Sequence, residues 1–365
     1  MRLIYLTVAT IPNKTAHSKY VMKLCESFKN NGKDVSIVSG KIKNINEKIE
    51  FKSYRLRIKE GKYKSLILAI FHFFYLLKQK LFFESKQEIY IVHNSLSAIF
   101  CSLLNVNYII DMHAKILKNK KSKKIISKNS PLFWIVQSNL LYEFVNNELN
   151  VKKDQILLSR NAVSEITSYE KIDEFYNNDK IIKFCYIGRL VPNTGFDDII
   201  KAINNIKYNN FIIYVAGDYE RYKSFYQDLF KKYPNSKNKI VFLGYLNENE
   251  INYLSNESDI LMALYSSKIS ILGALSPMKI FEYLRFNKKI LVPKIDDINE
   301  IVEYYNCEDR MRWYEIDNIV SLRKSILNLI EEKKYDTLEK INVETWDEKA
   351  KNILNFINNN YKKII

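Results

Sequence analysis

The first forty residues run through a short apolar strand, an amphipathic helix and a second apolar strand. The segment Leu3–Ala9 is rich in β-formers and ends in the turn Pro12-Asn13. A helix follows and ends at Gly32, with an apolar face made by Val21, Leu24, Cys25 and Phe28. Residues 35–38 then read as the next strand. A strand–helix–strand unit of this kind opens a doubly wound parallel sheet, so a Rossmann-like domain is predicted, with its strand ends facing a ligand.

The same alternation returns in the second half of the chain. A strand over 181–187 ends in Gly188-Arg189, and further strands end at Gly217 and Gly244. Half of the chain's eight glycines lie in the turns of this region: Gly188, Gly195, Gly217 and Gly244. Because glycine is scarce here, this placement indicates backbone turns that need it. A second Rossmann-like domain is therefore predicted over 181–345, after a polar linker at 164–180.

The segment 276–293 combines a helix start with charged residues. Ser276 is predicted to cap the helix and Pro277 to occupy its first position. Lys279 stands in the first turn, where the helix dipole disfavours a cation unless an anion is bound. Glu282, three residues on, shares its face. The simpler interpretation is an exposed Lys–Glu pair on an ordinary capped helix; the alternative is a phosphate site.

Residues 276–284, SPMKIFEYL, resemble the nucleotide-sugar motif of retaining glycosyltransferases of family 4, of the bacterial surface-polysaccharide type. The resemblance extends in order over nearly the whole chain and is strongest over 181–294. It implies the GT-B fold, an α/β fold with two Rossmann-like domains facing across a cleft. The first would be residues 1–165, the second 181–345, and a final helix at 346–365, opening at Trp346, would cross back to the first.

The resemblance also assigns roles to single residues. Glu282 would hold the donor ribose, and Arg189 with Lys279 would neutralise the diphosphate. The predicted donor-binding set is Gly188, Arg189, Gly217, Tyr245, Gly273, Ser276, Lys279 and Glu282. His113, after the strand 108–110, would lie against the donor sugar and is grouped with Arg189 and Lys279 as catalytic; His93 is the second candidate. Without the resemblance, a strand-end histidine is more often a satisfied loop residue.

Three positions depart from the family pattern. Thr194 stands where the family has a lysine that binds the diphosphate, and Lys279 is expected to substitute for it in part. Ala274 replaces the first of the family's paired glutamates, so amides of 273–275 are expected to contact the sugar instead. Ala162 replaces a glycine in the turn that leaves the first domain.

The chain carries a formal net charge of +16, which points to a polyanionic neighbour. Lysines follow the strand at 108–110 without an intervening acid, and the predicted acceptor or membrane side is His17, Lys120, Lys121, Lys123 and Lys124. These lysines are not interleaved with aromatic residues, so nucleic acid is not expected as a partner. The apolar helix predicted at 65–84 is either a buried domain helix or one lying at a membrane surface, where nearby basic residues would attract anionic lipid.

Cysteine and histidine patterns predict no metal site. The four cysteines include no CxxC pair, and the four histidines have no metal-ligand spacing. Reduced core thiols in the cytoplasm are expected, with no cofactor. The apolar run 66–77 is too short to span a bilayer, which takes about 20 residues.

The leading hypothesis is a retaining, hexosyl-type glycosyltransferase. It would move a sugar from a nucleotide-diphosphate donor to a growing surface glycan, such as lipopolysaccharide or capsule, with a polyprenyl-diphosphate-linked acceptor. It would work in the cytoplasm, peripherally on the inner face of the membrane. Two alternatives stay open: a nucleotide-sugar epimerase of the same fold, which needs no acceptor, and an inactive scaffold that binds membranes or polyanions.

Overall fold

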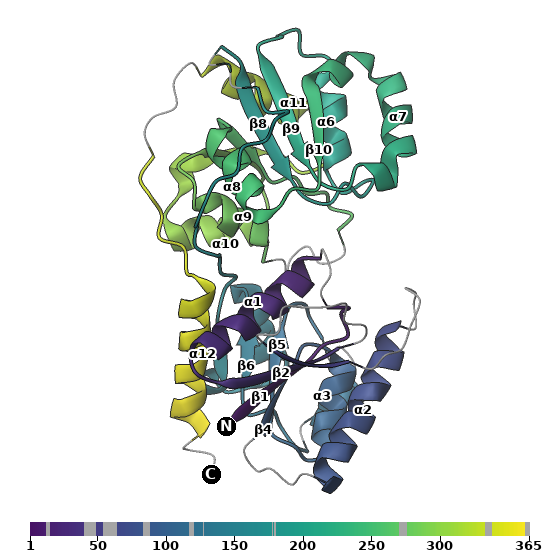
Figure 1. Cartoon of the computed structure of the whole chain (residues 1–365), viewed down its shortest axis with the longest axis vertical. Helices are drawn as coiled ribbons and strands as arrows, with labels where there is room; N and C mark the ends of the chain where they lie inside the picture. The colour runs from purple at the N-terminus through teal and green to yellow at the C-terminus, as the bar shows by residue number, and fades with distance from the viewer. Residues whose placement is uncertain are drawn as a thin grey trace. The chain divides into compact units, whose positions relative to one another are not determined.

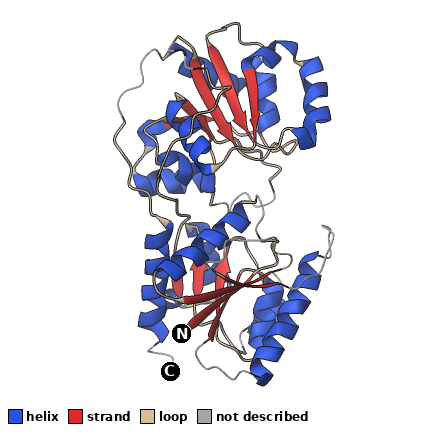
Figure 2. Ribbon diagram, viewed as in Figure 1, coloured by secondary structure: helices blue, strands red, loops and turns tan. Residues whose placement is uncertain are grey.

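A computed structural model of the chain shows two compact units (Figure 1). The structure describes residues 1–11, 15–39, 49–53, 64–82, 88–116, 120–126, 128–176, 178, 180–269, 276–332 and 338–361. The first unit contains Met1–Ala162 and Glu344–Ile365, together with Ser276. The second unit contains Val163–Gly273 and Pro277–Val343. Each is a parallel sheet covered by helices (Figure 2).

The sheet of the first unit has the strand order β3-β2-β1-β4-β5-β6-β7 among the described residues. Its strands are β1 (Arg2–Leu6), β2 (Asp34–Ser39), β3 (Glu50–Ser53), β4 (Glu88–Val92), β5 (Tyr108–Met112), β6 (Trp134–Val136) and β7 (Ile156–Leu158). All of their pairings are parallel. The order reverses between β1 and β4, and ligands of doubly wound sheets bind beyond the carboxyl ends of the strands at such a point. The predicted first Rossmann-like domain is confirmed.

Helices cover both faces of this sheet. They are α1 (Ala16–Asn30), α2 (Lys64–Phe82), α3 (Ser95–Leu103), α4 (Lys120–Ile126), α5 (Asn139–Glu143) and α12 (Trp346–Tyr361). Helix α1 begins where the Thr15 side chain accepts a hydrogen bond from the Ser18 amide, and its chain turns at Gly32 with φ +75°. The C-terminal helix α12 packs against α1 (Figure 1), and Trp346 is buried against Tyr20.

The second unit repeats the topology, with the order β10-β9-β8-β11-β12-β13 among the described residues. Its strands are β8 (Ile182–Ile187), β9 (Phe211–Ala216), β10 (Ile240–Gly244), β11 (Ile260–Met262), β12 (Lys289–Pro293) and β13 (Met311–Tyr314). Its helices are α6 (Phe196–Ile203), α7 (Lys223–Lys232), α8 (Glu248–Glu257), α9 (Met278–Leu284), α10 (Asp296–Tyr305) and α11 (Ile319–Glu331). The order reverses between β8 and β11, so this edge is the expected ligand side.

The segment predicted as a polar linker is part of the second unit. Ile172 and Phe175 are each 4% exposed and belong to its core, and the Tyr176 amide donates to the Tyr214 hydroxyl at 3.0 Å. The charged residues around these two apolar side chains suggested a solvated linker. Two well-placed apolar anchors are enough to bind an extended segment to a sheet-and-helix surface. The predicted linker at 164–180 is therefore packed against the second unit, which begins at Val163 and not at residue 181.

Candidate functional site

Helix α9 packs beside the carboxyl end of β8, and its charged residues Lys279 and Glu282 lie near that strand end. Ile280, Phe281 and Leu284 are buried, as their spacing predicted. The Tyr283 hydroxyl accepts from the Ile187 amide and donates to the Met262 carbonyl, each at 3.2 Å, so α9 is attached to both β8 and β11. Residues four apart share a helix face, and Lys279 therefore lies over the same strand end.

Lys279 lies among aromatic rings at the point where the strand order reverses. Its Nζ is 4.1 Å from the ring centre of Tyr186 in β8 and 5.8 Å from that of Tyr265, which follows β11. No hydrogen bond or ion pair joins Lys279 to any residue that the structure describes. Burial lowers the pKa of Lys279 to about 7; the Arg189 charge acts in the same direction, and Glu282 opposes it. A cation held this way is the natural counterpart of an anionic ligand.

The turns around this cation require glycine. A Cβ on Gly188 would lie 2.9 Å from the Lys279 Nζ, and a Cβ on Gly217 would lie 2.1 Å from the Gly188 carbonyl oxygen. The Gly217 amide in turn donates to the Gly244 carbonyl at 2.7 Å. The ends of β8, β9 and β10 therefore approach one another as bare backbone.

The other predicted donor residues of the second unit take distinct places. Arg189 is exposed beside Gly188. Glu282 is half-buried on α9, near enough to Lys279 to influence its charge. Tyr245 follows β10, is 53% exposed and donates to Asp218 at 3.2 Å. Gly273 lies outside the described residues, as does Ala274. Arg189, Glu282 and Lys279 are thus brought together, whereas Tyr245 projects into solvent from a strand two places away.

Two local predictions are corrected or explained. Ser276 does not cap α9: Pro277 is the N-cap residue, and the Ser276 hydroxyl and carbonyl instead accept from the Asn161 side-chain amide at 3.1 and 2.6 Å. The conformation of Pro277, with ψ 100°, places the helix start one residue later than the pattern indicated. Thr194, where the family has a lysine, donates its hydroxyl to the Val191 carbonyl at 2.7 Å and closes the turn before Gly195.

Three histidines gather at the carboxyl edge of the first unit's sheet. His17 comes from α1, His93 follows β4 and His113 follows β5. The ring centres of His17 and His93 are 4.2 Å apart, and those of His17 and His113 are 5.2 Å apart. Burial lowers the pKa of His17 to about 4 and lowers the pKa of His93 as well. Both rings are therefore neutral near pH 7 and can contribute hydrogen bonds but no charge.

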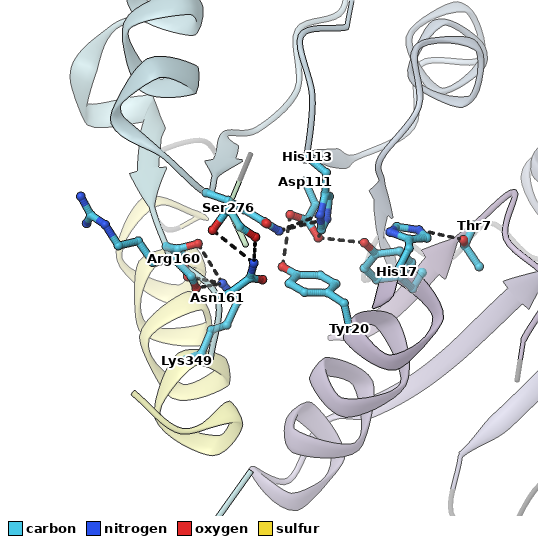
Figure 3. A network of polar contacts seen from close by, with 12 residues as sticks. Thr7, His17, Tyr20, Asp111, His113, Arg160, Asn161, Ser276 and Lys349 are labelled. Atoms are coloured by element: carbon cyan, nitrogen blue, oxygen red, sulfur yellow. Dashed lines mark hydrogen bonds and ion pairs between the residues drawn. The ribbon is translucent and has the colours of Figure 1, made fainter. Parts of the chain in front are cut away.

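The residue that organises this edge is Asp111 (Figure 3). Its carboxylate is fully buried and accepts from the Tyr5 hydroxyl at 2.8 Å and the Tyr20 hydroxyl at 3.3 Å. The His113 Nε2 lies 3.2 Å from it. Burial would raise the pKa of Asp111, but His113, the nearby Lys349 and these hydrogen bonds hold it well below its usual range. Asp111 therefore stays ionised in the core.

His113 is oriented from two sides. Asp111 faces its Nε2, and the Gln137 amide nitrogen lies 2.8 Å from its Nδ1. The same amide nitrogen lies 3.1 Å from Nε2, and the tautomer of His113 sets which ring nitrogen accepts from it. The edge of the Tyr20 ring packs against the imidazole with 4.4 Å between ring centres. His113, 23% exposed, is thus the histidine of the three whose orientation is set by a charged partner.

Helix α12 contributes a buried cation to the same network. The fully buried Lys349 donates to the Ser159 carbonyl at 2.9 Å, the Ser159 hydroxyl at 2.8 Å and the Arg160 carbonyl at 2.6 Å (Figure 3). Burial lowers the pKa of Lys349 to about 8, against the opposing effect of Asp111. The C-terminal helix therefore fixes the exit of the chain from β7 and supplies positive charge near Asp111.

The predicted acceptor-side lysines lie on α4, which begins seven residues after His113 in the chain but is a separate element from those that carry the histidine cluster. Lys121 and Lys124 are exposed, whereas the Lys123 Nζ donates to the Glu148 carbonyl at 3.1 Å. The side chain of Lys120 lies outside the described part of the chain. His17, predicted to belong to the same group, instead joins His93 and His113 and lies 3.4 Å from the Thr7 hydroxyl.

Among the described residues, no group of three or more His, Cys, Asp or Glu side chains is placed to hold a metal ion. All four cysteines are buried and unpaired. The prediction of core thiols is confirmed.

The sequence model of one protein family, "Glycosyl transferases group 1", matches residues 168–351, which is half of the chain. The chain belongs to this family. The match includes all of the donor-side residues discussed above, from Gly188 to Glu282. The family-level prediction of a glycosyltransferase is thereby confirmed.

Solved structures show the fold of the glycosyltransferase. A glycosyltransferase from Rickettsia africae superposes with a TM-score of 0.71 at 15% identity, covering 99% of this chain and 98% of that one. Sucrose-phosphate synthase from Thermosynechococcus elongatus gives 0.76 at 11% identity over 100% of both chains. The Anabaena protein HepE in complex with UDP gives 0.64 at 11% identity, covering 100% and 98%. The fold is GT-B, as predicted. No curated protein matches this glycosyltransferase by sequence.

Sequence reasoning missed two parts of these sites. It did not assign roles to Tyr186 and Tyr265, whose rings surround Lys279. It also did not foresee that Asp111 and Lys349 are buried charges of one network. Asp111 lies inside a strand of otherwise apolar residues. Burying an unpaired carboxylate costs free energy, so a charged residue in such a strand indicates that partners lie around it in the fold.

Proposed function

We propose that this glycosyltransferase transfers a hexosyl group, with retention of configuration, from a nucleotide-diphosphate sugar to a growing surface glycan. The proposed acceptor glycan is carried on a lipid diphosphate at the inner face of the cytoplasmic membrane. The observation that carries the donor half is the arrangement of Lys279, Arg189 and Glu282 at the strand-order reversal of the second unit.

The chemistry of these three side chains suits a nucleotide diphosphate. Lys279 and Arg189 supply positive charge next to the bare backbone of Gly188, where a diphosphate can approach closely. Glu282 offers a carboxylate for ribose hydroxyls. UDP bound to the Anabaena neighbour and the ADP bound to an Arabidopsis starch synthase of similar fold support a nucleotide as ligand.

In the proposed reaction, the leaving diphosphate gains negative charge as the glycosidic bond to the sugar breaks. Lys279 and Arg189 stabilise that charge because they are already in place and need little reorganisation. The diphosphate accepts the proton of the acceptor hydroxyl, so we assign no side chain as base. His113 is assigned to the sugar, as the resemblance of the chain to family 4 implies, and Asp111 holds its orientation.

The experiment is a thermal-shift screen of the purified protein with UDP, GDP, ADP and CMP. We expect one nucleoside diphosphate to raise the melting temperature, because a ligand that binds only the folded state stabilises it. The same screen on Arg189→Ala should show a much smaller shift. Lys231→Ala is the matched control, since Lys231 is an exposed lysine of the same unit that pairs with Asp228.

A second measurement separates transfer from epimerisation. The sugar form of the nucleotide that binds is incubated with the protein, with and without a membrane extract carrying lipid-linked glycans. Release of nucleoside diphosphate that depends on the extract supports transfer. Conversion of the nucleotide sugar without an acceptor would support an epimerase. An Arg189→Ala protein that shifts and reacts like the parent would contradict the donor site.

A further inference from the structure

The outer face of α2 is apolar over its whole length. Its exposed apolar residues repeat at helical spacing: Leu66 (43% exposed), Ile70 (41%), Phe74 (57%) and Leu81 (65%). Half-buried Leu77 lies on the same line, and Ile67 and Phe82, also exposed, lie beside it. At about 100° per residue the four residues fall within an arc of about 80°. We name this set the α2 stripe. The outward face of a helix in a soluble domain is normally polar, so the stripe marks a binding surface.

The opposite face of α2 is part of the protein core. Leu68, Ala69 and Leu76 are at most 1% exposed, and His72 is fully buried with its Nδ1 2.7 Å from the Ser97 hydroxyl of α3. The segment Ser65–Phe82 has a mean hydropathy of 1.4 and is long enough to cross a bilayer by length and composition, yet this packing attaches it to the sheet. Crossing a membrane would expose the core of the first unit. The helix therefore lies along a surface and does not span it.

The surroundings of the stripe are basic. Lys78 and Lys80 flank it on α2, and the Lys80 Nζ donates to the Leu104 carbonyl at the end of α3. Helix α3 packs beside α2, as Figure 1 shows, and α4 packs beside α3, joined by the Ser102 hydroxyl donating to the Ile125 carbonyl at 2.9 Å. As the structure describes them, α2 and α4 contain lysines, α3 between them contains no charged residue, and none of the three helices contains Asp or Glu.

We propose that the α2 stripe, with the lysines of α2 and α4, is a docking surface for an anionic lipid bilayer. The stripe would enter the boundary between headgroups and acyl chains, while Lys78, Lys121 and Lys124 contact anionic headgroups. A basic rim around an apolar stripe favours a lipid surface over a second copy of this chain, because two copies would bring like charges together. The inference rests on the proposed function only in that a lipid-linked acceptor requires the enzyme to reach a membrane.

The test is sedimentation of the full chain with vesicles of phosphatidylcholine alone and with about a third phosphatidylglycerol. We expect binding to the anionic vesicles at low salt and weaker binding at high salt. Phe74→Ser with Leu81→Ser should lower the partition coefficient at least roughly tenfold, because two large apolar side chains no longer enter the lipid. The matched control is Val320→Ser with Tyr304→Ser, which changes two exposed apolar residues of the second unit.

The outcomes separate this inference from the donor site. The stripe variant is Phe74→Ser with Leu81→Ser. Its thermal shift with the nucleoside diphosphate should equal that of the parent, because Phe74 and Leu81 lie in the first unit and the proposed donor site lies in the second. No binding to anionic vesicles, or equal binding by the stripe variant, would overturn the proposal. A stripe variant that changes the sedimentation coefficient from dimer to monomer would also overturn it and identify a second copy as the occupant. Weakened binding by Lys121→Glu with Lys124→Glu would support the basic rim.

Discussion

The two units place opposite kinds of charge near the carboxyl ends of their strands. In the first unit, a buried carboxylate, Asp111, is surrounded by hydroxyl donors, His113 and the Lys349 cation. In the second unit, the cation Lys279 lies between tyrosine rings, and no described residue gives it a hydrogen bond or an ion pair. One charge is neutralised within the fold. The other is the charge to which we assign the diphosphate in the proposed function.

Under the proposed function, the difference separates charges that stabilise the fold from charges that bind a ligand. A buried charge with its partners in place makes removal of either partner costly. A buried charge without partners costs stability in the free protein, and the cost is recovered when a ligand of opposite sign arrives. The first unit should therefore be sensitive to mutation in its stability, and the second in its affinity.

The largest expected effect is the loss of Asp111. Asp111→Ala leaves the Tyr5 and Tyr20 hydroxyls without their acceptor and removes the negative charge near His113 and Lys349. We expect the free energy of unfolding to fall by about 3 kcal/mol. Urea unfolding followed by circular dichroism measures it. Asp228→Ala, at a solvent-exposed ion pair, should change the free energy of unfolding far less. Equal costs for the two variants would show that the Asp111 network does not stabilise the first unit.

The second expected effect is that of Lys279→Met, which should leave the free energy of unfolding unchanged or raise it. Lys279→Met removes a half-buried cation and keeps a chain of similar length, so the free protein should be as stable as the parent or more so. The affinity for the nucleoside diphosphate should fall by about 2 kcal/mol, because charged hydrogen bonds to phosphate are lost. Calorimetric titration and thermal melting measure the two quantities. A less stable variant with full affinity would reverse the roles that we assign to the two units.

The third prediction concerns the pH dependence of binding. Because the pKa of Lys279 is lowered to about 7 in the free protein, its amine is largely neutral above pH 7. A bound diphosphate favours the charged form, so binding takes up a proton there. Affinity should fall by up to about tenfold per pH unit between pH 7 and 9. In Lys279→Met the dependence should disappear; an unchanged slope would mean that another group titrates.

The fourth prediction, the smallest, is a loss of stability of the first unit in mild acid. The pKa values of His17 and His72 are lowered to about 4 by burial. Between pH 4 and 6.5 the unfolded chain therefore binds more protons than the folded one, and stability is lost as the pH falls. We expect a decrease on the order of 1 kcal/mol between pH 7 and 6, measured by urea unfolding. His17→Gln combined with His72→Gln should make the curve less steep, and the slope that remains comes from buried His93. A parent curve that is already flat would contradict the burial argument.

The sequence predicted the parts of this structure that follow from local pattern. Apolar strands and helical spacing located both Rossmann-like units, and the glycines at 188, 217 and 244 marked the strand ends that approach one another. The position of Lys279 followed from its place in the first turn of α9. These features depend on neighbours in the chain, which a single sequence displays.

The features that sequence reasoning missed depend on contacts between distant residues. Asp111 meets Tyr5 across 106 positions, and Lys349 reaches Ser159 across 190. The burial of Ile172 and Phe175 was hidden by the charged residues around them. The prediction that Ser276 caps α9 was wrong because its hydroxyl and carbonyl both accept hydrogen bonds from the side chain of Asn161, 115 residues earlier. Long-range pairing of polar groups leaves little trace in local pattern.

The central claim is that the cations of the second unit bind the diphosphate of a nucleotide. The most direct measurement is calorimetric titration of the nucleoside diphosphate found in the screen and of its monophosphate, into the parent protein and into Arg189→Ala/Lys279→Met. The account predicts that the parent binds the diphosphate at least about tenfold more tightly than the monophosphate, and that the double variant loses this preference. Equal affinities for the two nucleotides in the parent, or a preference that survives in the double variant, would contradict it.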